Sequence, residues 1–171
     1  MDKKQKCSVS ITRINNLHIQ GGDNMGKYIH YGSDHFDPLI FEPIYNDIGI
    51  NKPRGGFWAS PVAAEHGWRD WCETENFCTE SLNTYFEFNI RNDAKILYIR
   101  NKSEMIDVAA RYKTDFGLGL ILTYIDWERI AADGYQAIVF EMNNDTHWDY
   151  NMWDVDTLVV IDPDIVIPDE I

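Results

Sequence analysis

The residues best suited to chemistry are carboxylates near the end of the chain. Asp154 and Asp156 stand two positions apart, just before a run of aliphatic residues. Side chains two apart on a strand share a face, so both carboxylates of this pair could reach one site. Paired carboxylates also suit glycoside hydrolysis, but nothing in the sequence selects one pair. Cysteine chemistry is less favoured, because Cys72 and His66 carry no signature of a nucleophilic dyad.

Charge is distributed unevenly along the 171 residues. The chain has 28 acidic and 15 basic residues, a formal net charge of −13. Every basic residue lies at or before Arg129, whereas ten acids follow it. A general binder of duplex DNA or RNA needs a basic surface, so the composition argues against that class, although Lys52, Arg54 and Arg69 offer a local basic patch. The acidic excess indicates a partner-binding surface or a site that uses carboxylates.

Length and composition are those of one globular domain, with 44% hydrophobic and 25% charged residues. The apolar runs fall far short of the ~18 residues that a membrane span needs, and the polar start lacks the apolar region of a secretory signal. The three cysteines form no CxxC pair and indicate reduced thiols. We therefore expect a cytoplasmic protein with no membrane partner and no metal.

The hydrophobic pattern predicts an α+β fold with about six strands and three helices. Residues 1–24 are expected to be a polar arm, with a possible edge strand at 8–14 and an alternative translation start at Met25. Residues 25–171 are expected to form a single domain. Predicted strands cover residues 27–32, 55–60, 82–90, 94–100, 135–142 and 155–167, the last interrupted at Pro163. Predicted helices cover residues 61–77, 104–112 and 126–132.

Local signals define several boundaries. Ser60 and Pro61 have the residue types expected at a helix start, and Asp126 has that of an N-cap. The turn at Asn92-Asp93 predicts a hairpin between the strands at 82–90 and 94–100. Residues 33–53 contain scattered prolines and are expected to be a long irregular loop. The aromatic and acidic loop at 143–153 suits a binding rim, or a loop pinned by its aromatic side chains.

Three separated segments together resemble one known family. They are a strand with His, then Gly-Ser (IHYGS, 29–33), a glycine-led aromatic strand before a helix (GGFWAS, 55–60), and a late strand ending in Asp (DTLVVIDPDIV, 156–166). In this order and spacing they resemble the ADP-ribosyltransferase fold, in its diphtheria-toxin and poly(ADP-ribose) polymerase branch. They are also similar to small phage and bacterial proteins of that fold. That branch carries a His-Gly-Ser/Thr strand, a Gly-x-Tyr-Phe-Ala-Ser/Asp strand and a late Glu-x-x-Val-x-Asp strand.

The resemblance implies a fold and a reaction. Two small, mostly antiparallel sheets would enclose a cleft for NAD, which is the substrate, and no metal would be needed. ADP-ribose would pass to a macromolecular acceptor, and the acidic composition favours a protein over a nucleic acid. The bond between ribose and nicotinamide would break through an oxocarbenium-like transition state that a carboxylate stabilises.

The resemblance also assigns residues to this site. Cofactor contacts are expected at His30, Tyr31, Gly32, Phe57, Trp58, Ser60, Trp68 and Trp71. Phe57 stands at the family's tyrosine position, with Trp58 as the alternative if the register shifts by one. Thr157 stands where the family has its catalytic glutamate, so Asp154 and Asp156 are the candidate acids. Tyr31 separates the His and Gly that are usually adjacent in the family.

A non-enzymatic function is the alternative. An acidic, phage-like interaction or inhibitor protein could use a degenerate transferase scaffold and bind a basic partner through its C-terminal acids. The two hypotheses differ in whether NAD is bound and consumed, and in whether partner binding falls steeply with salt.

Overall fold

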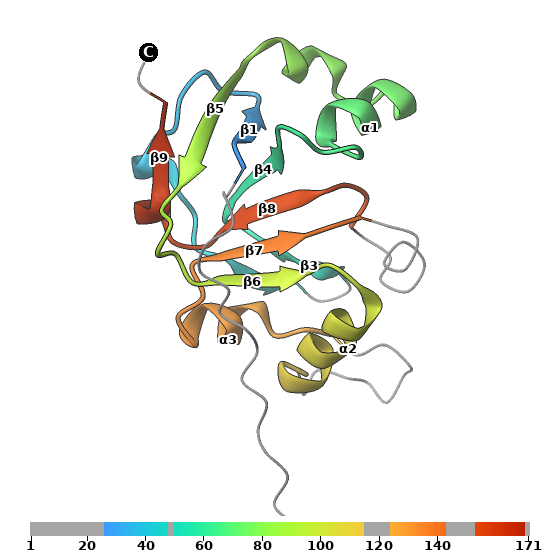
Figure 1. Ribbon diagram of the computed structural model, residues 1–171, viewed down its shortest axis with the longest axis vertical. Coiled ribbons are helices and arrows are strands. Elements are labelled where there is room, and N and C mark those ends of the chain that lie inside the picture. Colours follow the sequence, from blue (N-terminus) through green and yellow to red (C-terminus); the bar gives the residue numbers. More distant parts are fainter. Residues whose placement is uncertain (1–25, 48–49, 115–123, 143–152, 170–171) are drawn as a thin grey trace, which may run out of the picture.

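The computed structural model describes residues 26–47, 50–114, 124–142 and 153–169 (Figure 1). The predicted arm at 1–24 and most of the aromatic loop at 143–153 lie outside these residues. The helices are α1 (Trp68–Glu75), α2 (Lys102–Arg111) and α3 (Trp127–Ala132), with short 3-10 turns η1 (Pro38–Ile40), η2 (Thr79–Asn83) and η3 (Pro163–Ile165). The strands are β1 (Tyr28–Tyr31), β2 (Tyr45–Asp47), β3 (Ile50–Arg54), β4 (Phe57–Pro61), β5 (Tyr85–Ile90), β6 (Ile96–Ile99), β7 (Ala137–Phe140), β8 (Thr157–Val160) and β9 (Val166–Pro168). The predicted α+β class is confirmed.

A seven-stranded sheet in the order β6-β7-β8-β4-β1-β5-β9 dominates the structure, beside a two-stranded sheet of β2 and β3. Only β6 and β7 run parallel; the other neighbours are antiparallel. Strand β4 changes partner along its length, because Phe57 to Ala59 pair with β8 and Ser60 and Pro61 pair with β1. The sheet is therefore divided at β4 into two halves whose strands run in different directions (Figure 1).

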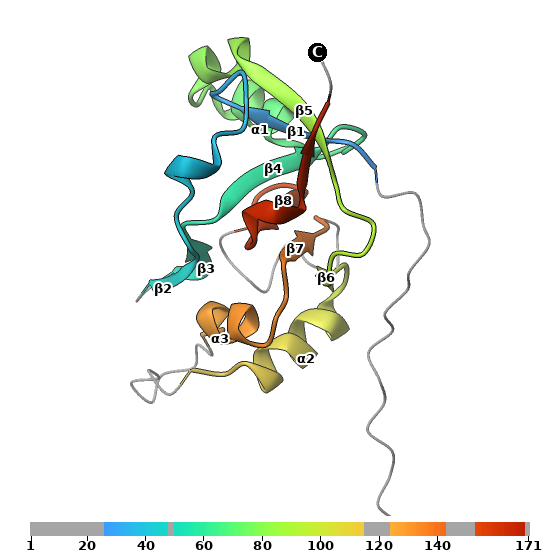
Figure 2. The ribbon, with the colours of Figure 1, turned by 90° about the vertical axis from the view of Figure 1, so that its left-hand side faces the viewer.

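Burial on both faces explains the continuous apolar sequences of β7 and β8, whose residues are all buried. Ile138 and Val159 belong to one core cluster, with residues of α2 and α3. Val139 and Leu158 face the other way and pack with Phe88 and other residues of the β1-β5-β9 half. Figure 2 shows α2 and α3 together next to β6 and β7. The core thus fixes the β6-β7-β8 half between the helices and the other half of the sheet.

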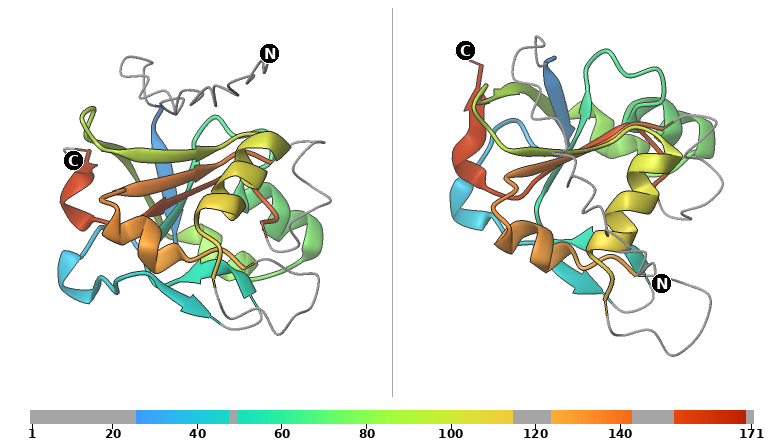
Figure 3. Two further views of the ribbon diagram at one scale, coloured as in Figure 1. Left: turned by 90° about the horizontal axis from the view of Figure 1, so that it is seen from below. Right: turned by 60° about the horizontal axis from the view of Figure 1, so that its bottom comes forward.

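The helices predicted at 104–112 and 126–132 are observed as α2 and α3, and each is capped at its N-terminus by a side chain. The side chain of Asn101 accepts a hydrogen bond from the Glu104 N–H and caps α2. The side chain of Asp126 accepts from the Arg129 N–H and caps α3. Asp126 also accepts a hydrogen bond from the Asn46 side chain, which attaches the β2–β3 pair to α3 (Figure 3). These caps satisfy N–H groups that a helix leaves without a partner in its first turn.

Three local predictions are wrong. The first helix begins at Trp68, because Pro61 is the last residue of β4 and pairs with Tyr28. The strands at 82–90 and 94–100 form no hairpin, since β5 pairs with β1 and β9 while β6 pairs with β7 at the opposite edge. The expected loop at 33–53 contains η1, β2 and β3.

The last predicted strand is divided as expected at Pro163. Its first part is β8, in the centre of the sheet, and its second part is β9, at the far edge beside β5. Asp162 caps the turn between them, because its side chain accepts from the Asp164 N–H and from the Gln136 side chain. Within the described ranges, no helix is long and apolar enough to cross a membrane.

Candidate functional site

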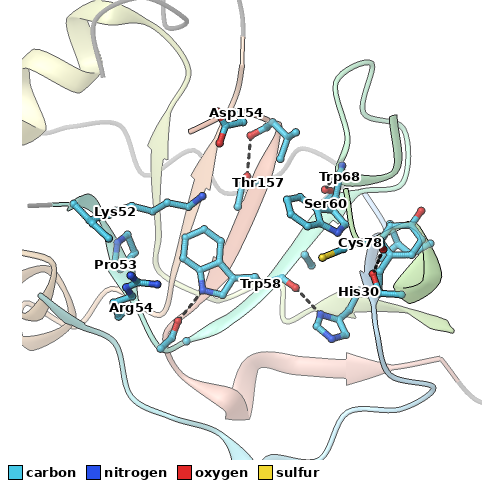
Figure 4. A pocket seen from close by; sticks show the side chains of 18 of the residues that line it. His30, Lys52, Pro53, Arg54, Trp58, Ser60, Trp68, Cys78, Asp154 and Thr157 are labelled. Atoms are coloured by element: carbon cyan, nitrogen blue, oxygen red, sulfur yellow. Dashed lines mark hydrogen bonds between the residues drawn. The ribbon is translucent and has the colours of Figure 1, made fainter. Parts of the chain in front are cut away.

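A cavity of about 950 Å³ opens where β4 changes partner. This volume is within the usual range for small-molecule sites, roughly 300–1,000 Å³. Figure 4 shows the cavity between β3 on one side and α1 with η2 on the other. Its described lining comprises Ile29, His30, Tyr31, Ile50, Lys52, Pro53, Arg54, Gly55, Gly56, Trp58, Ala59, Ser60, Trp68, Cys78, Glu80, Ser81, Asp154, Val155 and Thr157. All three sequence segments that suggested a site therefore contribute to one cavity.

The alternation of side chains on β4 decides which aromatic residue enters the cavity. Trp58 pairs with Val159 and lines the cavity, and its Nε1 donates to the Gly55 carbonyl oxygen over 2.7 Å. Phe57 points to the opposite face and packs against Phe86 and Phe88. Phe57 therefore does not line the cavity, whereas the alternative, Trp58, does. Neighbouring residues on a strand face opposite sides of the sheet.

His30 lies at the boundary between the cavity and the core. Its Nδ1 donates to the Trp58 carbonyl oxygen over 2.7 Å, which fixes the tautomer because a carbonyl can only accept. The ring centroid lies 4.4 Å from that of Phe57. Burial lowers the pKa of His30 below its usual value of 6.5, while the bond to Trp58 opposes this effect. The neutral imidazole therefore keeps Nε2 as an acceptor.

Tyr31 and Gly32 follow His30 but differ in their roles. Tyr31 lines the cavity, and its hydroxyl accepts a hydrogen bond of 3.2 Å from Arg69 Nε. Gly32 does not line the cavity, and its N–H donates to the Thr84 carbonyl oxygen. Its φ of +101° suits glycine, whereas a Cβ there would meet no atom within 4 Å. Backbone conformation, and not space for a ligand, therefore explains this glycine.

Ser60 and the helix α1 place a second aromatic residue in the cavity. Gly67 at the start of α1 has no side chain for capping, and the Ser60 hydroxyl oxygen accepts from the Trp68 N–H over 3.0 Å. Ser60 thus caps this helix from eight residues away, not from the adjacent position expected. Trp68 lines the cavity, whereas Trp71 does not; it stacks on Trp68 with a centroid distance of 5.1 Å. Trp71 therefore supports the wall that Trp68 forms.

The three candidate catalytic residues are separated by the backbone before β8. Asp154 is exposed and lines the cavity. Asp156 does not line it: its N–H donates to the His66 carbonyl oxygen and its Oδ1 accepts from the Met142 N–H. The shared face expected for Asp154 and Asp156 is wrong, because the strand begins only at Thr157. Thr157 lines the cavity, but its hydroxyl donates to the Val155 carbonyl oxygen.

Sequence analysis did not assign several lining residues to this site. Lys52 comes from β3 within the expected loop, Arg54 ends the same strand just beyond that loop, and Cys78, Glu80 and Ser81 come from the η2 region. Arg54 is exposed and forms an ion pair of 2.8 Å with Asp47. Burial lowers the pKa of Lys52; the negative charge of Asp154 raises it and Arg54 lowers it further. The prolines and glycines around β3 obscured its strand pattern, and the sequence marked Lys52 and Arg54 only as part of a local basic patch.

Trp153 is buried, which agrees with the expected alternative of a loop pinned by its aromatic side chains. It flanks the aromatic loop, but only 3% of its surface is exposed, and its ring stacks on Phe140 with a centroid distance of 4.8 Å. Its Nε1 donates to the Asn51 carbonyl oxygen. The described end of the loop is therefore anchored in the core, and residues 143–152 lie outside the described ranges.

Comparisons with protein-family profiles, curated proteins and solved structures found no match to this chain. Among the described residues, no group of three or more His, Cys, Asp or Glu side chains could hold a metal ion. The cavity itself offers aromatic surfaces, a half-buried cation and a carboxylate. These groups suit a polar ligand with a flat ring and a negative charge.

The lowered pKa of His30 predicts a dependence of stability on pH. An unfolded His30 binds a proton near pH 6.5, whereas the folded protein resists this proton. The unfolded state therefore binds more protons as the pH falls below about 6.5, and the stability contributed by this residue is lost in acid. We expect His30→Asn, which can keep the bond to Trp58, to make the thermal midpoint less sensitive to pH between about 7 and 5.

His35→Asn is the matched control. His35 is exposed, and its hydrogen bond with Asp34 raises its pKa. Its contribution to stability is present at low pH and lost as the pH rises, so this substitution should increase the acid sensitivity of the midpoint. Thermal melts at several pH values measure both effects. Equal pH profiles for wild type and His30→Asn would contradict the prediction.

Proposed function

We propose that the protein binds NAD in this cavity and transfers ADP-ribose to a macromolecular acceptor. The observation that carries the proposal is the convergence of three distant segments on one cavity. His30 comes from β1, Trp58 and Ser60 come from β4, and Thr157 begins β8, with Asp154 just before it. The resemblance to ADP-ribosyltransferases was drawn from the order and spacing of these segments in the sequence. Their meeting at one cavity is a separate observation, because it depends on the fold. The divided sheet also suits the two-sheet cleft which that resemblance implies.

The cavity offers groups that could contact the nicotinamide ring and a ribose of NAD. Trp58 and Trp68 supply aromatic surfaces on which nicotinamide could stack. The neutral His30 offers Nε2 as an acceptor for a ribose hydroxyl. Among the described residues the Ser60 hydroxyl meets no acceptor, so its hydrogen can serve a ligand oxygen.

The reaction requires one bond to break and one to form. The bond between the ribose carbon and the nicotinamide nitrogen breaks, and nicotinamide leaves with the electron pair. The ribose then carries positive charge, which the carboxylate of Asp154 stabilises at the cavity. A nucleophilic atom of the acceptor forms the new bond to the ribose carbon and loses its proton. Preorganised charge of this kind is a major source of catalysis.

The non-enzymatic alternative stays a prediction without a specific supporting contact. Several C-terminal acids already serve the fold: Asp156 accepts from the Met142 N–H, Asp162 from Gln136, and Asp169 forms an ion pair of 2.6 Å with Lys27. These contacts occupy carboxylates that an acidic binding surface would need. A protein acceptor remains our preference over a nucleic acid, because the chain is acidic.

Trp68→Ala tests whether NAD occupies the cavity. Loss of a stacking surface typically costs about 1–3 kcal/mol per ring, so the Kd for NAD should rise about tenfold or more. Titration calorimetry measures the affinity, and release of nicotinamide from labelled NAD measures turnover.

Phe77→Ala is the matched control for the Trp68 substitution. Phe77 packs edge-on against Trp68 and Trp71 but does not line the cavity. The Phe77→Ala variant should bind NAD with nearly wild-type affinity. If wild-type protein neither binds NAD nor releases nicotinamide, with basic proteins supplied as acceptors, the proposed function is wrong.

A further inference from the structure

We propose that Lys52 binds the diphosphate of the ligand and so fixes where the phosphates of a dinucleotide lie in the cavity. This inference rests on the proposed function for the identity of the dinucleotide. The residue itself was found through the tertiary structure, since β3 lies within a segment without a recognisable motif. The argument uses the position, packing and charge environment of its ammonium group.

Lys52 is held in place by its surroundings. Its Nζ lies 5.1 Å from the ring centroid of Trp58 and 5.9 Å from that of Trp153. Figure 4 shows the side chain extending from β3 above Trp58 into the cavity. The preceding residue, Asn51, is fixed at two atoms, because its side-chain oxygen accepts from the Ile125 N–H and its carbonyl oxygen accepts from Trp153 Nε1. The ammonium group is therefore preorganised at the cavity surface.

The charge of Lys52 lacks a close partner in the described part of the chain. No described carboxylate lies within 4.0 Å of its Nζ, and no hydrogen bond joins it to a described residue. Arg54, on the same strand, is instead paired with Asp47. Burying an ammonium group is costly, and the lowered pKa of Lys52 reflects this cost, although the negative charge of Asp154 partly opposes it. An anion bound in the cavity would offset it.

Lys52 and Arg54 supply positive charge at the β3 end of the cavity, where Asp154 is the carboxylate whose charge acts on Lys52. Glu80 lines the cavity from η2, whose N-cap residue Cys78 lies across the cavity from Lys52 (Figure 4), and its negative charge would repel a phosphate there. A diphosphate has several oxygens that can accept hydrogen bonds from an ammonium group. With the phosphates at Lys52, the nucleoside rings are left to the aromatic and polar residues of β4 and α1.

Lys52→Met is the decisive variant, because it keeps the apolar stem on Trp58 and removes only the charge. Calorimetry would compare three probes: NAD, ADP-ribose, and nicotinamide riboside, which lacks phosphate. We expect the Kd for NAD and ADP-ribose to rise about tenfold or more, and the Kd for nicotinamide riboside to stay unchanged. Lys52→Arg, which keeps the charge, should recover part of the lost affinity.

Lys95→Met provides the matched control. Lys95 also lies over an aromatic ring, with its Nζ 4.3 Å from the Tyr135 centroid, but it does not line the cavity. The Lys95→Met variant should bind all three probes with the affinities of the wild-type protein. The thermal midpoint of Lys52→Met should equal or exceed that of wild type, since the cost of burying the ammonium charge has been removed.

The outcomes separate this inference from the proposed function. Equal weakening of all three probes, or no weakening, overturns the role of Lys52, as does a wild-type protein that fails to bind ADP-ribose. If NAD is consumed with an unchanged KM in Lys52→Met, the inference fails while the function stands. If phosphate-bearing probes need Lys52 but no nicotinamide is released, the inference stands while the proposed transferase activity fails.

Discussion

Asp154→Asn is expected to lower kcat for nicotinamide release by about 10²–10³-fold, the loss typical when one preorganised electrostatic group is removed. The substitution keeps the size of the side chain and an oxygen that can accept hydrogen bonds, but it removes the negative charge. Because this charge acts on the oxocarbenium-like transition state, KM for NAD should change much less than kcat. Steady-state kinetics with labelled NAD would separate the two constants.

Asp156→Asn is the control for this substitution. Asp156 does not line the cavity, and an asparagine there can still accept the hydrogen bond from the Met142 N–H. Its kcat should therefore stay near that of wild type. If Asp156→Asn were the inactive variant and Asp154→Asn the active one, our assignment of the acid would be wrong. If NAD were consumed equally by both variants, the carboxylate mechanism would have to be abandoned.

Gly55→Ala is expected to destabilise the protein by about 3 kcal/mol or more, a fall in the thermal midpoint of about 6 °C or more for a chain of this size. Gly55 has a φ of +66°, in the left-handed region, and a Cβ there would overlap the carbonyl oxygen of Pro43. The overlap involves backbone on both sides, so no flexible side chain can move away. The affected turn joins β3 to β4 and accepts the hydrogen bond from Trp58 Nε1.

Gly134→Ala distinguishes the overlap from the conformation alone. Gly134 has a φ of +82°, but a Cβ there would meet no atom within 4 Å. This variant should lose only about 1 kcal/mol, from the left-handed backbone. Chemical denaturation of both variants measures the difference. Equal losses would mean that the close approach of Gly55 to Pro43 contributes nothing.

Local signals explain which predictions were successful. Asn101 and Asp126 cap their helices through contacts with residues three positions away, so a short stretch of sequence contains the whole interaction. The apolar stretches at 135–142 and 155–167 likewise identified β7 and β8, because a strand buried on both faces needs apolar residues throughout.

The failed predictions all depended on distant partners. Ser60 caps α1, but through a helix start eight residues away and not at its own position. The turn at Asn92 and Asp93 suggested a hairpin, yet β6 found its partner in β7, which is over forty residues along the chain. Strand β3 was hidden among prolines and glycines, and with it Lys52. Short-range patterns carry no information about such pairings.

The sequence by itself determined the α+β class, most strand and helix positions, and the three segments that supply the candidate site. Only the tertiary structure decided which side chains of those segments enter the cavity. Asp154 enters in place of Asp156, because hydrogen bonds to His66 and Met142 hold Asp156 elsewhere. Trp58 enters in place of Phe57, because strand pairing sets the face on which each residue of β4 lies. A shift of one residue reverses that face, and pairing between distant strands, not local composition, fixes it.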